Sequence, residues 1–397
     1  MRAADGGNLS ERIKRARELA GYTQTEVAEL LGKSRSTIAE IEGGRRRVDS
    51  LLLRDLAGLF GIAPWELLGP SPEPRGATAL REALFRSVSE DGISAGDRKE
   101  LAAFWQAVER FAQLAEKAGR PKPSLPETSH LTRTSVPQYV LEGAANGASA
   151  WLMGGQRAAS WELDSLRKQI EEENIAVFFW PLDRDPISGL TINHTHLGPI
   201  VLVNASQLRR RQLFTLAHEL GHVWLHRDQQ IVISRTSERT PLERQADAFA
   251  AEFLMPEAEL KRALARLQAR GELGVAQIVA LHRVFGVSYK AMLVRLRRLR
   301  IIQEEQFQRL SEVPPVSIAA RLGYKLDPTE VGDVPNVPFY ERYPREYLEL
   351  VFGAWEAGEI GEGKAAQLLD IDRYSLNEYV RHVEATLAAQ QKEEVPM

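Results

Sequence analysis

Apolar residues recur at helical spacing along most of the chain, and breaks in this pattern divide it into segments. Between Leu9 and Leu68 the apolar positions repeat every three or four residues and are cut by short turns, which predicts a group of short helices. The proline-rich stretches 69–74 and 119–128 predict two extended linkers. Between them, residues 77–118 predict a helical connector, whose apolar stripe packs either on the downstream region or on a second copy of the chain.

Short β-rich runs appear in the middle of the chain. The stretches Ile175–Leu182, Gly189–Asn193 and Pro199–Asn204 are separated by Pro, Asp and Gly and predict a small three-stranded sheet. A long helix follows, with Ser206 as its expected N-cap, and the pattern then stays mostly helical. The sequence therefore predicts a mainly α protein with a small β-sheet, built from an all-α N-terminal part, an α+β part and a helical C-terminal part.

The helix ends within the first 68 residues follow the order of a helix-turn-helix. Thr23-Gln24-Thr25-Glu26 forms a capping box, Gly32 ends that helix, and Ser34 caps the next one, Arg35–Glu42. Two short helices joined by such a turn place the second helix in the major groove of DNA. The alternative is a small helical unit that binds no DNA.

The expected DNA contacts come from these two helices and from the turn after the second one. The second helix would point into the groove, whereas the start of the first would lie against the phosphates. The glycine-containing turn that follows carries cations suited to contacts with the DNA backbone. The candidate residues are Gln24, Arg35, Ser36, Thr37, Glu40, Arg45 and Arg46.

The sequence His218-Glu219-Leu220-Gly221-His222 carries the most specific chemistry in the chain. Two histidines four residues apart on a helix project from nearly the same face, so their imidazoles can meet one metal ion. Glu219 lies next to the first histidine, where it can take a proton from a water molecule. This arrangement is typical of zinc hydrolases, and the alternative is a helix that carries two histidines by chance.

Zinc needs a third protein ligand, and the helix predicted after this motif offers one. Glu243 and Asp247 lie four residues apart and share a face. We expect Glu243 to ligate the metal and Asp247 to accept the free ring N–H of a ligating histidine, although either acid alone would be an ordinary solvated charge. His226 is expected to be a helix-end histidine rather than a ligand, and His194 and His196 to lie at a hairpin tip.

Composition limits the remaining chemistry. The chain has 397 residues, 44% of them hydrophobic and 26% charged, which is ordinary for a globular protein of two or three domains. Because it contains no cysteine, its metal ligands have to be histidine or carboxylate. The net charge of −3 is no guide to partners, although a local basic edge lies between Lys33 and Arg47. Since the sequence has neither a membrane-spanning run nor a signal peptide, we expect a cytoplasmic protein without a membrane partner.

Both parts of the chain resemble known families. Residues 9–68 resemble the Xre/Cro type of phage-repressor domain, and residues of roughly 160–300 resemble the ImmA/IrrE metallopeptidases. Their order resembles the Xre–ImmA fusions of bacteria and phages. The first resemblance rests on Thr23-Gln24, Ala28, Leu31-Gly32, Ser34, Ile38, Ile41-Glu42 and Gly44-Arg45, and the second on Phe214–His222, Ala246-Asp247, Phe249-Ala250 and Leu254-Met255-Pro256.

The resemblance implies a division of the chain and a set of roles. It implies an Xre/Cro-type DNA-binding domain at 9–68, the helical connector at 77–118, a zincin-like α+β peptidase domain at 136–300 and a helical extension at 301–397. In that family the peptidase cleaves a repressor of Xre type after DNA damage or another stress. The matching metal ligands are His218, His222 and Glu243, and the matching catalytic acid/base is Glu219.

The sequence thus predicts a DNA-binding, zinc-dependent endopeptidase, with Mn²⁺ as the alternative metal. Its expected partners are a double-stranded DNA operator and a repressor of Xre type as substrate, and an operator with two half-sites would imply a homodimer. Two other functions stay open. One is a transcription factor whose peptidase domain senses a metal or a partner without proteolysis, and the other is an antitoxin bound to a toxin through its C-terminal helices.

Overall fold

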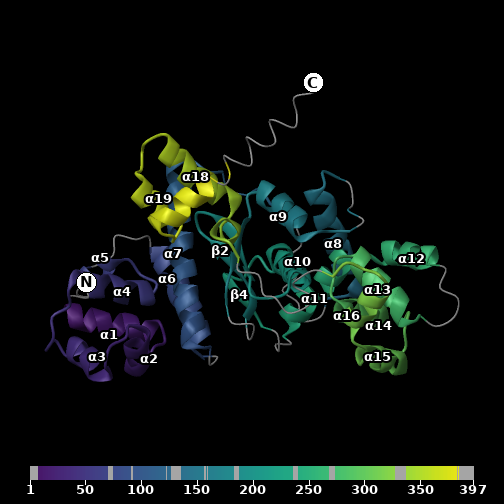
Figure 1. Ribbon diagram of the computed structural model, residues 1–397, viewed down its shortest axis with the longest axis horizontal. Helices are drawn as coiled ribbons and strands as arrows, with labels where there is room; N and C mark the ends of the chain where they lie inside the picture. The colour runs from purple at the N-terminus through teal and green to yellow at the C-terminus, as the bar shows by residue number, and fades with distance from the viewer. Residues whose placement is uncertain are drawn as a thin grey trace.

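The computed structural model describes residues 8–69, 75–90, 93–121, 123–126, 136–155, 158, 160–182, 187–235, 240–267, 273–326, 337–381 and 383. Over these ranges the chain is mainly helical with one small four-stranded sheet, which confirms the predicted fold class. Figure 1 shows the N-terminal helices at one end of an elongated molecule and the sheet near its centre. Of the predicted linker at 69–74, all but Gly69 lies outside the described residues, whereas most of 119–128 is described and contains neither a helix nor a strand in those positions.

Five short helices form the N-terminal unit around one small apolar core. They are α1 (Leu9–Leu19), α2 (Gln24–Leu30), α3 (Arg35–Glu42), α4 (Ser50–Leu59) and α5 (Pro64–Leu68). The predicted residues begin and end α2 and begin α3. Thr23 and Glu26 form a capping box, Gly32 takes a φ of 60° after α2, and the Ser34 side chain accepts from the backbone N–H of Thr37.

Two long helices connect this unit to the sheet. They are α6 (Arg75–Glu90) and α7 (Ala95–Lys117), and the predicted apolar stripe of α7 is buried. The Phe104 ring lies 5.2 Å from that of Phe178 and 5.9 Å from that of Trp180, both on the first strand. The stripe therefore packs on the downstream region of the same chain, the first of the two predicted alternatives.

The sheet has one strand more than predicted. Its strands are β1 (Ala176–Trp180), β2 (Ile187–His194), β3 (Gly198–Asn204) and β4 (Ile231–Arg235), in the order β1-β3-β2-β4. β1 runs parallel to β3, and the other two pairs are antiparallel. The three-stranded prediction was wrong because β4 is only five residues long and follows the long helix, so its partner β2 lies far away in sequence.

Alternate residues of the strands enter two different cores, because successive side chains of a strand point to opposite faces. One face packs on α9 (Leu163–Glu172) and α10 (Arg209–Leu225), and the other packs on α7 and C-terminal helices. The sheet is therefore the middle layer of three. Its residues in the first core are Val177, Phe179, Val201 and Val203, and those in the second are Ala176, Phe178, Trp180, Ile187, Leu190, Ile192, Ile200 and Leu202.

The long helix α10 begins later than predicted. Leu208 is its N-cap and provides no side-chain hydrogen bond, so the expectation that Ser206 caps the helix was wrong. Ser206 lies instead in a turn that Asn204 closes, because the Asn204 side chain accepts from the backbone N–H groups of Ser206 and Leu182. After β4, α11 (Pro241–Leu254) packs across α10, with Thr240 as its N-cap, and α8 (Gln138–Leu152) covers α11.

The C-terminal helices divide between the two cores. The helices α12 (Glu257–Arg266), α13 (Val275–Val284), α14 (Tyr289–Arg298), α15 (Glu304–Ser311) and α16 (Pro315–Arg321) extend the core around α10. The helices α17 (Phe339–Arg342), α18 (Arg345–Glu356), α19 (Glu362–Leu368) and 373–381 lie on the α7 side of the sheet. The stretch 301–397 is thus mainly helical where it is described, but it belongs to two packing units. No helix in the described ranges is long and apolar enough to span a membrane.

Candidate metal centre and nucleic-acid interface

Three buried side chains converge between α10 and α11. His218 and His222 lie one turn apart on α10, and Glu243 comes from the first turn of α11. The two Nε2 atoms are 3.1 Å apart, and the Glu243 oxygens lie 3.2 Å from His218 Nε2 and 3.3 Å from His222 Nε2. Among the residues that the structure describes, these three form the group that could hold a metal ion.

The spacing of these donor atoms fits a tetrahedral cation. Ligand atoms placed about 2.0–2.1 Å from a zinc ion at tetrahedral angles lie roughly 3.3 Å from one another. The observed separations of 3.1 to 3.3 Å agree with this geometry. Two imidazoles and one carboxylate leave a fourth position open, which is characteristic of catalytic rather than structural zinc sites.

The outer nitrogen of each imidazole is held by a neighbour. His218 Nδ1 lies 3.0 Å from Asp247 Oδ1, the contact that the sequence predicts for this acid. His222 Nδ1 lies 2.9 Å from His226 Nδ1, and His226 Nε2 lies 3.0 Å from Gln245 Oε1. If the His222 Nδ1–H donates to His226 Nδ1, then His226 must carry its own proton on Nε2 and donate it to Gln245 Oε1. This order of donors and acceptors fixes the tautomers of both rings. When both ligand rings are neutral, as a bound metal would require, each presents a lone pair on Nε2 toward the metal position.

The charges of the three residues suit a site for a positive ion. Burial lowers the pKa of His218, but hydrogen bonds to Asp247 and Glu243 outweigh it and raise this pKa to about 10. Burial raises the pKa of Glu243, yet the two histidines outweigh it and lower this pKa to about 2. Burial lowers the pKa of His222 to about 4. The surrounding acids therefore stabilise one positive charge at this place, which a divalent cation would supply more fully.

Glu219 points from α10 toward the sheet. Its Oε2 accepts a 2.6 Å hydrogen bond from the Thr191 hydroxyl on β2, and its Oε1 is buried without a hydrogen-bond partner within the described ranges. Gly189, two residues earlier on β2, leaves room for this carboxylate, because a Cβ there would overlap it. Burial raises the pKa of Glu219 to about 7, against the opposing charge of His218.

This arrangement is suited to peptide hydrolysis. A metal ion held by the three residues would supply Lewis acidity toward a carbonyl group. Glu219 has a pKa near neutrality, so it is suited to take a proton from water and to return it to a leaving amine. Its position one residue from His218 on α10 keeps the carboxylate close enough to interact electrostatically with His218 and Glu243.

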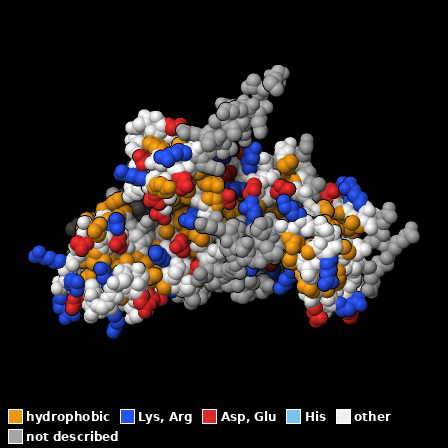
Figure 2. All heavy atoms as spheres, in the orientation of Figure 1, with side chains coloured by type: hydrophobic (Ala, Val, Ile, Leu, Met, Phe, Trp, Pro, Cys, Tyr) orange, Lys and Arg blue, Asp and Glu red, His pale blue; other side chains and the backbone are white. Residues whose placement is uncertain are grey.

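The N-terminal candidates lie on α2, on α3 and in the turn that follows. Arg35, Ser36, Arg45 and Arg46 are exposed, whereas Gln24, Thr37 and Glu40 are half-buried. Figure 2 shows Lys and Arg side chains at the outer edge of this unit, mixed with acidic ones.

Several candidates have partners inside the unit. Arg46 lies 3.6 Å from Glu40, which holds the turn beside the end of α3. The Gln24 amide donates to Glu42 at 2.9 Å, and Glu42 also pairs with the buried Arg17 at 2.6 Å. Gln24 therefore joins α2 to α3 in addition to any contact with a phosphate.

Some residues around these sites escape sequence reasoning. Thr191 and Gly189 lie on β2, and Gln245 lies on α11, where an ordinary polar position gives no sign that it contacts His226. One weak signal exists, because a glycine inside a strand often marks the close approach of another group. His194 lies at the hairpin between β2 and β3, as predicted, and its Nδ1 accepts from the backbone N–H groups of His196 and Leu197.

Comparison with known proteins identifies both parts. Residues 13–67 match the family described as helix-turn-helix, and residues 170–297 match the family described as IrrE N-terminal-like domain. Over 59 residues the chain is 41% identical to the "Uncharacterized HTH-type transcriptional regulator YazB" of Bacillus subtilis (strain 168). That alignment covers 15% of this chain and 86% of the relative. No solved structure matches the chain.

The fold and the comparisons together define a helix-turn-helix protein fused to a metallopeptidase-like domain. The chain belongs to the helix-turn-helix regulators of Xre type and carries, in its C-terminal part, a domain of the IrrE/ImmA peptidase family. These findings confirm the family resemblance seen in the sequence.

The hydrogen-bonded chain from His222 to Gln245 leads to a prediction on metal affinity. His226→Ala should weaken zinc binding by about 10- to 100-fold, because His222 loses the group that fixes its tautomer and ring orientation. Competition with a fluorescent chelator measures the affinity. The matched control is His196→Ala, an exposed histidine outside the site. Equal affinities of the two variants would show that His226 does not position His222.

The raised pKa of Glu219 predicts a pH-dependent stability of the metal-free protein. Its pKa is about 7 in the folded chain against 4.5 for an ordinary glutamate, so the advantage of the buried neutral carboxyl is lost as the pH rises through 7. At pH 8, Glu219→Gln should therefore raise the free energy of unfolding by about 3 kcal/mol. The gain should shrink as the pH falls toward 5.

Urea unfolding in the presence of a chelator, at both pH values, measures this difference. A gain of the same size at pH 8 and pH 5 would mean that Glu219 does not titrate with a raised pKa.

Proposed function

We propose that this protein is a DNA-binding regulator whose zinc-dependent endopeptidase domain cleaves a transcriptional repressor of Xre type and so relieves repression under stress. The observation that carries the proposal is the convergence of His218, His222 and Glu243, with Glu219 beside them, in a chain that also holds a helix-turn-helix unit. We further propose that zinc is the resident metal, with Mn²⁺ as the alternative, and that the protein acts in the cytoplasm.

The choice of an endopeptidase rests on the complete set of side chains. A domain that only sensed a metal would need the three ligands but not a buried carboxylate with a pKa near 7. Asp247 orients His218 at 3.0 Å, which gives the ligands the outer support that catalytic zinc sites use. Glu219 is therefore assigned as the general base, His218, His222 and Glu243 as the ligands, and Asp247 as the residue that positions His218.

The choice of a DNA-associated substrate rests on how the N-terminal unit is attached. Arg98 of α7 lies 4.9 Å over the Tyr22 ring and pairs with Glu26, and the Gln106 amide of α7 donates to the carbonyl oxygens of Gly58 and Ile62. These contacts hold the unit on α7 while α3 stays at the outer edge (Figure 1). Binding to DNA would thus bring the peptidase domain to proteins bound at the same operator.

The proposed cleavage is tested by mapping new protein termini in cells that make either the wild type or Glu219→Gln. A small set of termini present only with the wild type, and enriched under DNA damage, would identify the substrate. His196→Ala serves as a control that should keep the wild-type pattern. Identical termini for the wild type and Glu219→Gln, with zinc bound to both, would contradict proteolysis and favour a metal- or partner-sensing regulator.

The proposed DNA interface makes a prediction for the turn after α3. Arg45→Gln should weaken DNA binding about equally on all duplex sequences. It should also reduce the slope of log binding constant against log salt concentration by about one, because the exposed cation would neutralise one DNA phosphate. The measurement is fluorescence anisotropy on a duplex selected from random sequence, at several salt concentrations. The exposed Lys14→Gln on α1 is the control, and equal salt slopes for Arg45→Gln and the wild type would exclude Arg45 from the interface.

A further inference from the structure

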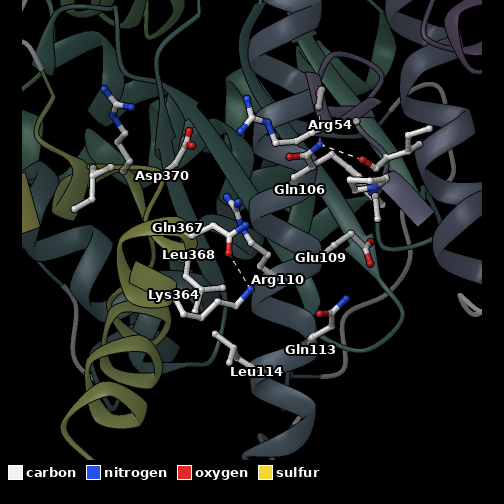
Figure 3. Close-up of a pocket in the computed structure, with 18 of the residues that line it drawn as sticks. Arg54, Gln106, Glu109, Arg110, Gln113, Leu114, Lys364, Gln367, Leu368 and Asp370 are labelled. Atoms are coloured by element: carbon white, nitrogen blue, oxygen red, sulfur yellow. Dashed lines mark hydrogen bonds between the residues drawn. The ribbon is translucent and has the colours of Figure 1, made fainter. Parts of the chain in front are cut away.

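A large cavity lies where three distant parts of the chain meet. Its volume is about 1090 Å³, and its walls come from α4 and α5 of the N-terminal unit, from the middle of α7, and from the C-terminal helices α17 and α19. Figure 3 shows Arg110, Gln113 and Leu114 of α7 across this space from Lys364, Gln367 and Leu368 of α19. The size suits a small organic molecule, and junctions between domains are common places for such pockets.

Several of the cations that line this cavity form no ion pair within the described ranges. Arg54 and Arg81 also reach it, but they pair with Asp55 and Glu66. Four further cations line the cavity, and in the part of the chain that the structure describes none of them forms an ion pair with a carboxylate. Of these, Lys364 donates to Gln367 at 3.2 Å, and Arg342 donates to the Val337 carbonyl at 3.3 Å. These four cations are Arg110, Lys117, Arg342 and Lys364.

Arg110 is the most constrained of these cations. Its Nε is buried and, within the described ranges, has no hydrogen-bond acceptor, while its positive charge opposes the rise that burial gives to the pKa of the nearby Tyr347 hydroxyl. Three of the four acids that line the cavity have other contacts: Glu66 pairs with Arg81, Asp372 accepts from Ser375, and Glu109 lies 3.7 Å from His194. The fourth, Asp370, remains to accept a donor group. The balance favours a ligand with negative charge, because fixed guanidinium and ammonium groups bind carboxylate, sulfonate or phosphate oxygens.

Apolar and aromatic side chains complete the lining. Trp65 of α5 is half exposed at 51%, which is unusual for a tryptophan without a partner surface. A simple inorganic anion would leave this apolar surface in water, whereas an anion with an apolar body would cover it. The other apolar members are Ile62, Leu114, Phe339, Ile360, Leu368 and Ile371.

We propose that this cavity binds a small organic anion, with its charged group toward Arg110, Lys117 and Lys364 and its apolar or aromatic body toward Trp65. The site is separate from the metal centre, because the sheet lies between them. Since one wall belongs to the helix-turn-helix unit and another to α7, a bound ligand fixes the first against the second. The proposal does not depend on proteolysis or on DNA binding.

The proposal is tested with the full-length protein and anilinonaphthalene sulfonate, an aromatic anion whose fluorescence rises in apolar surroundings. We expect one saturable site per chain. Lys117→Gln with Lys364→Gln should weaken it by at least about tenfold, because each lysine that contacts the anion contributes about one charge-assisted hydrogen bond of that size. Both lysines are exposed, so these changes avoid the electrostatic interaction of Arg110 with Tyr347. Trp65→Ala should also weaken probe binding, because it removes the apolar surface that contacts the aromatic body of the probe. The exposed Lys290→Gln on α14 should leave probe binding unchanged.

Competition identifies the class of ligand. An aromatic carboxylate should displace the probe at lower concentration than inorganic phosphate does. Probe binding that does not saturate, or that is equal in the wild type and the double lysine variant, would overturn the site. Displacement by phosphate as effective as that by the aromatic carboxylate would overturn the assignment to an organic anion.

Discussion

The close approach of α11 to α10 is the constraint on which the rest of the structure depends. Gly221 makes it achievable, because a Cβ at this position would lie 3.1 Å from the Phe249 ring and 3.4 Å from the Ala246 Cα. This approach brings the Glu243 carboxylate within 3.3 Å of both imidazoles, which lie one turn apart on α10. Buried ionisable groups are costly unless they have a hydrogen-bond or ion-pair partner. Here His218 pairs with Asp247, His222 with His226, and Glu219 with the Thr191 hydroxyl.

The sheet joins this site to the N-terminal half of the chain. On β2, Gly189 and Thr191 face Glu219, whereas the intervening Leu190 and the next residue, Ile192, enter the core shared with α7. The same α7 carries Arg98, which holds the helix-turn-helix unit through Tyr22 and Glu26. A shift of α7 would therefore reach both the helix-turn-helix unit and the strand beside Glu219. This connection physically links the helix-turn-helix unit to the metallopeptidase-like domain.

The sequence predicts best where one short segment contains the whole pattern. The spacing of His218 and His222 follows from helix geometry alone, and the caps Thr23 and Ser34 act within three residues. Glu243 lies on a second helix, and its four-residue spacing from Asp247 and its position after the motif together pointed to it. One prediction failed because the partner is distant in sequence: β4 pairs with β2 across α10. The predicted cap failed for a local reason, because Asn204, two residues before Ser206, closes the turn there and α10 begins after Leu208. The contacts of Glu219 with β2 depend on tertiary packing that no local pattern encodes.

The most direct test of this account is X-ray absorption at the zinc edge on the purified full-length protein, with the metal content measured on the same sample. The account predicts one zinc per chain with two imidazole nitrogens at about 2.0–2.1 Å and oxygen ligands in the remaining positions. It also predicts that Glu243→Gln loses metal while the exposed Glu116→Gln does not. A protein that binds no zinc or manganese, or a bound zinc with a single imidazole ligand, would contradict the metal centre and the function built on it.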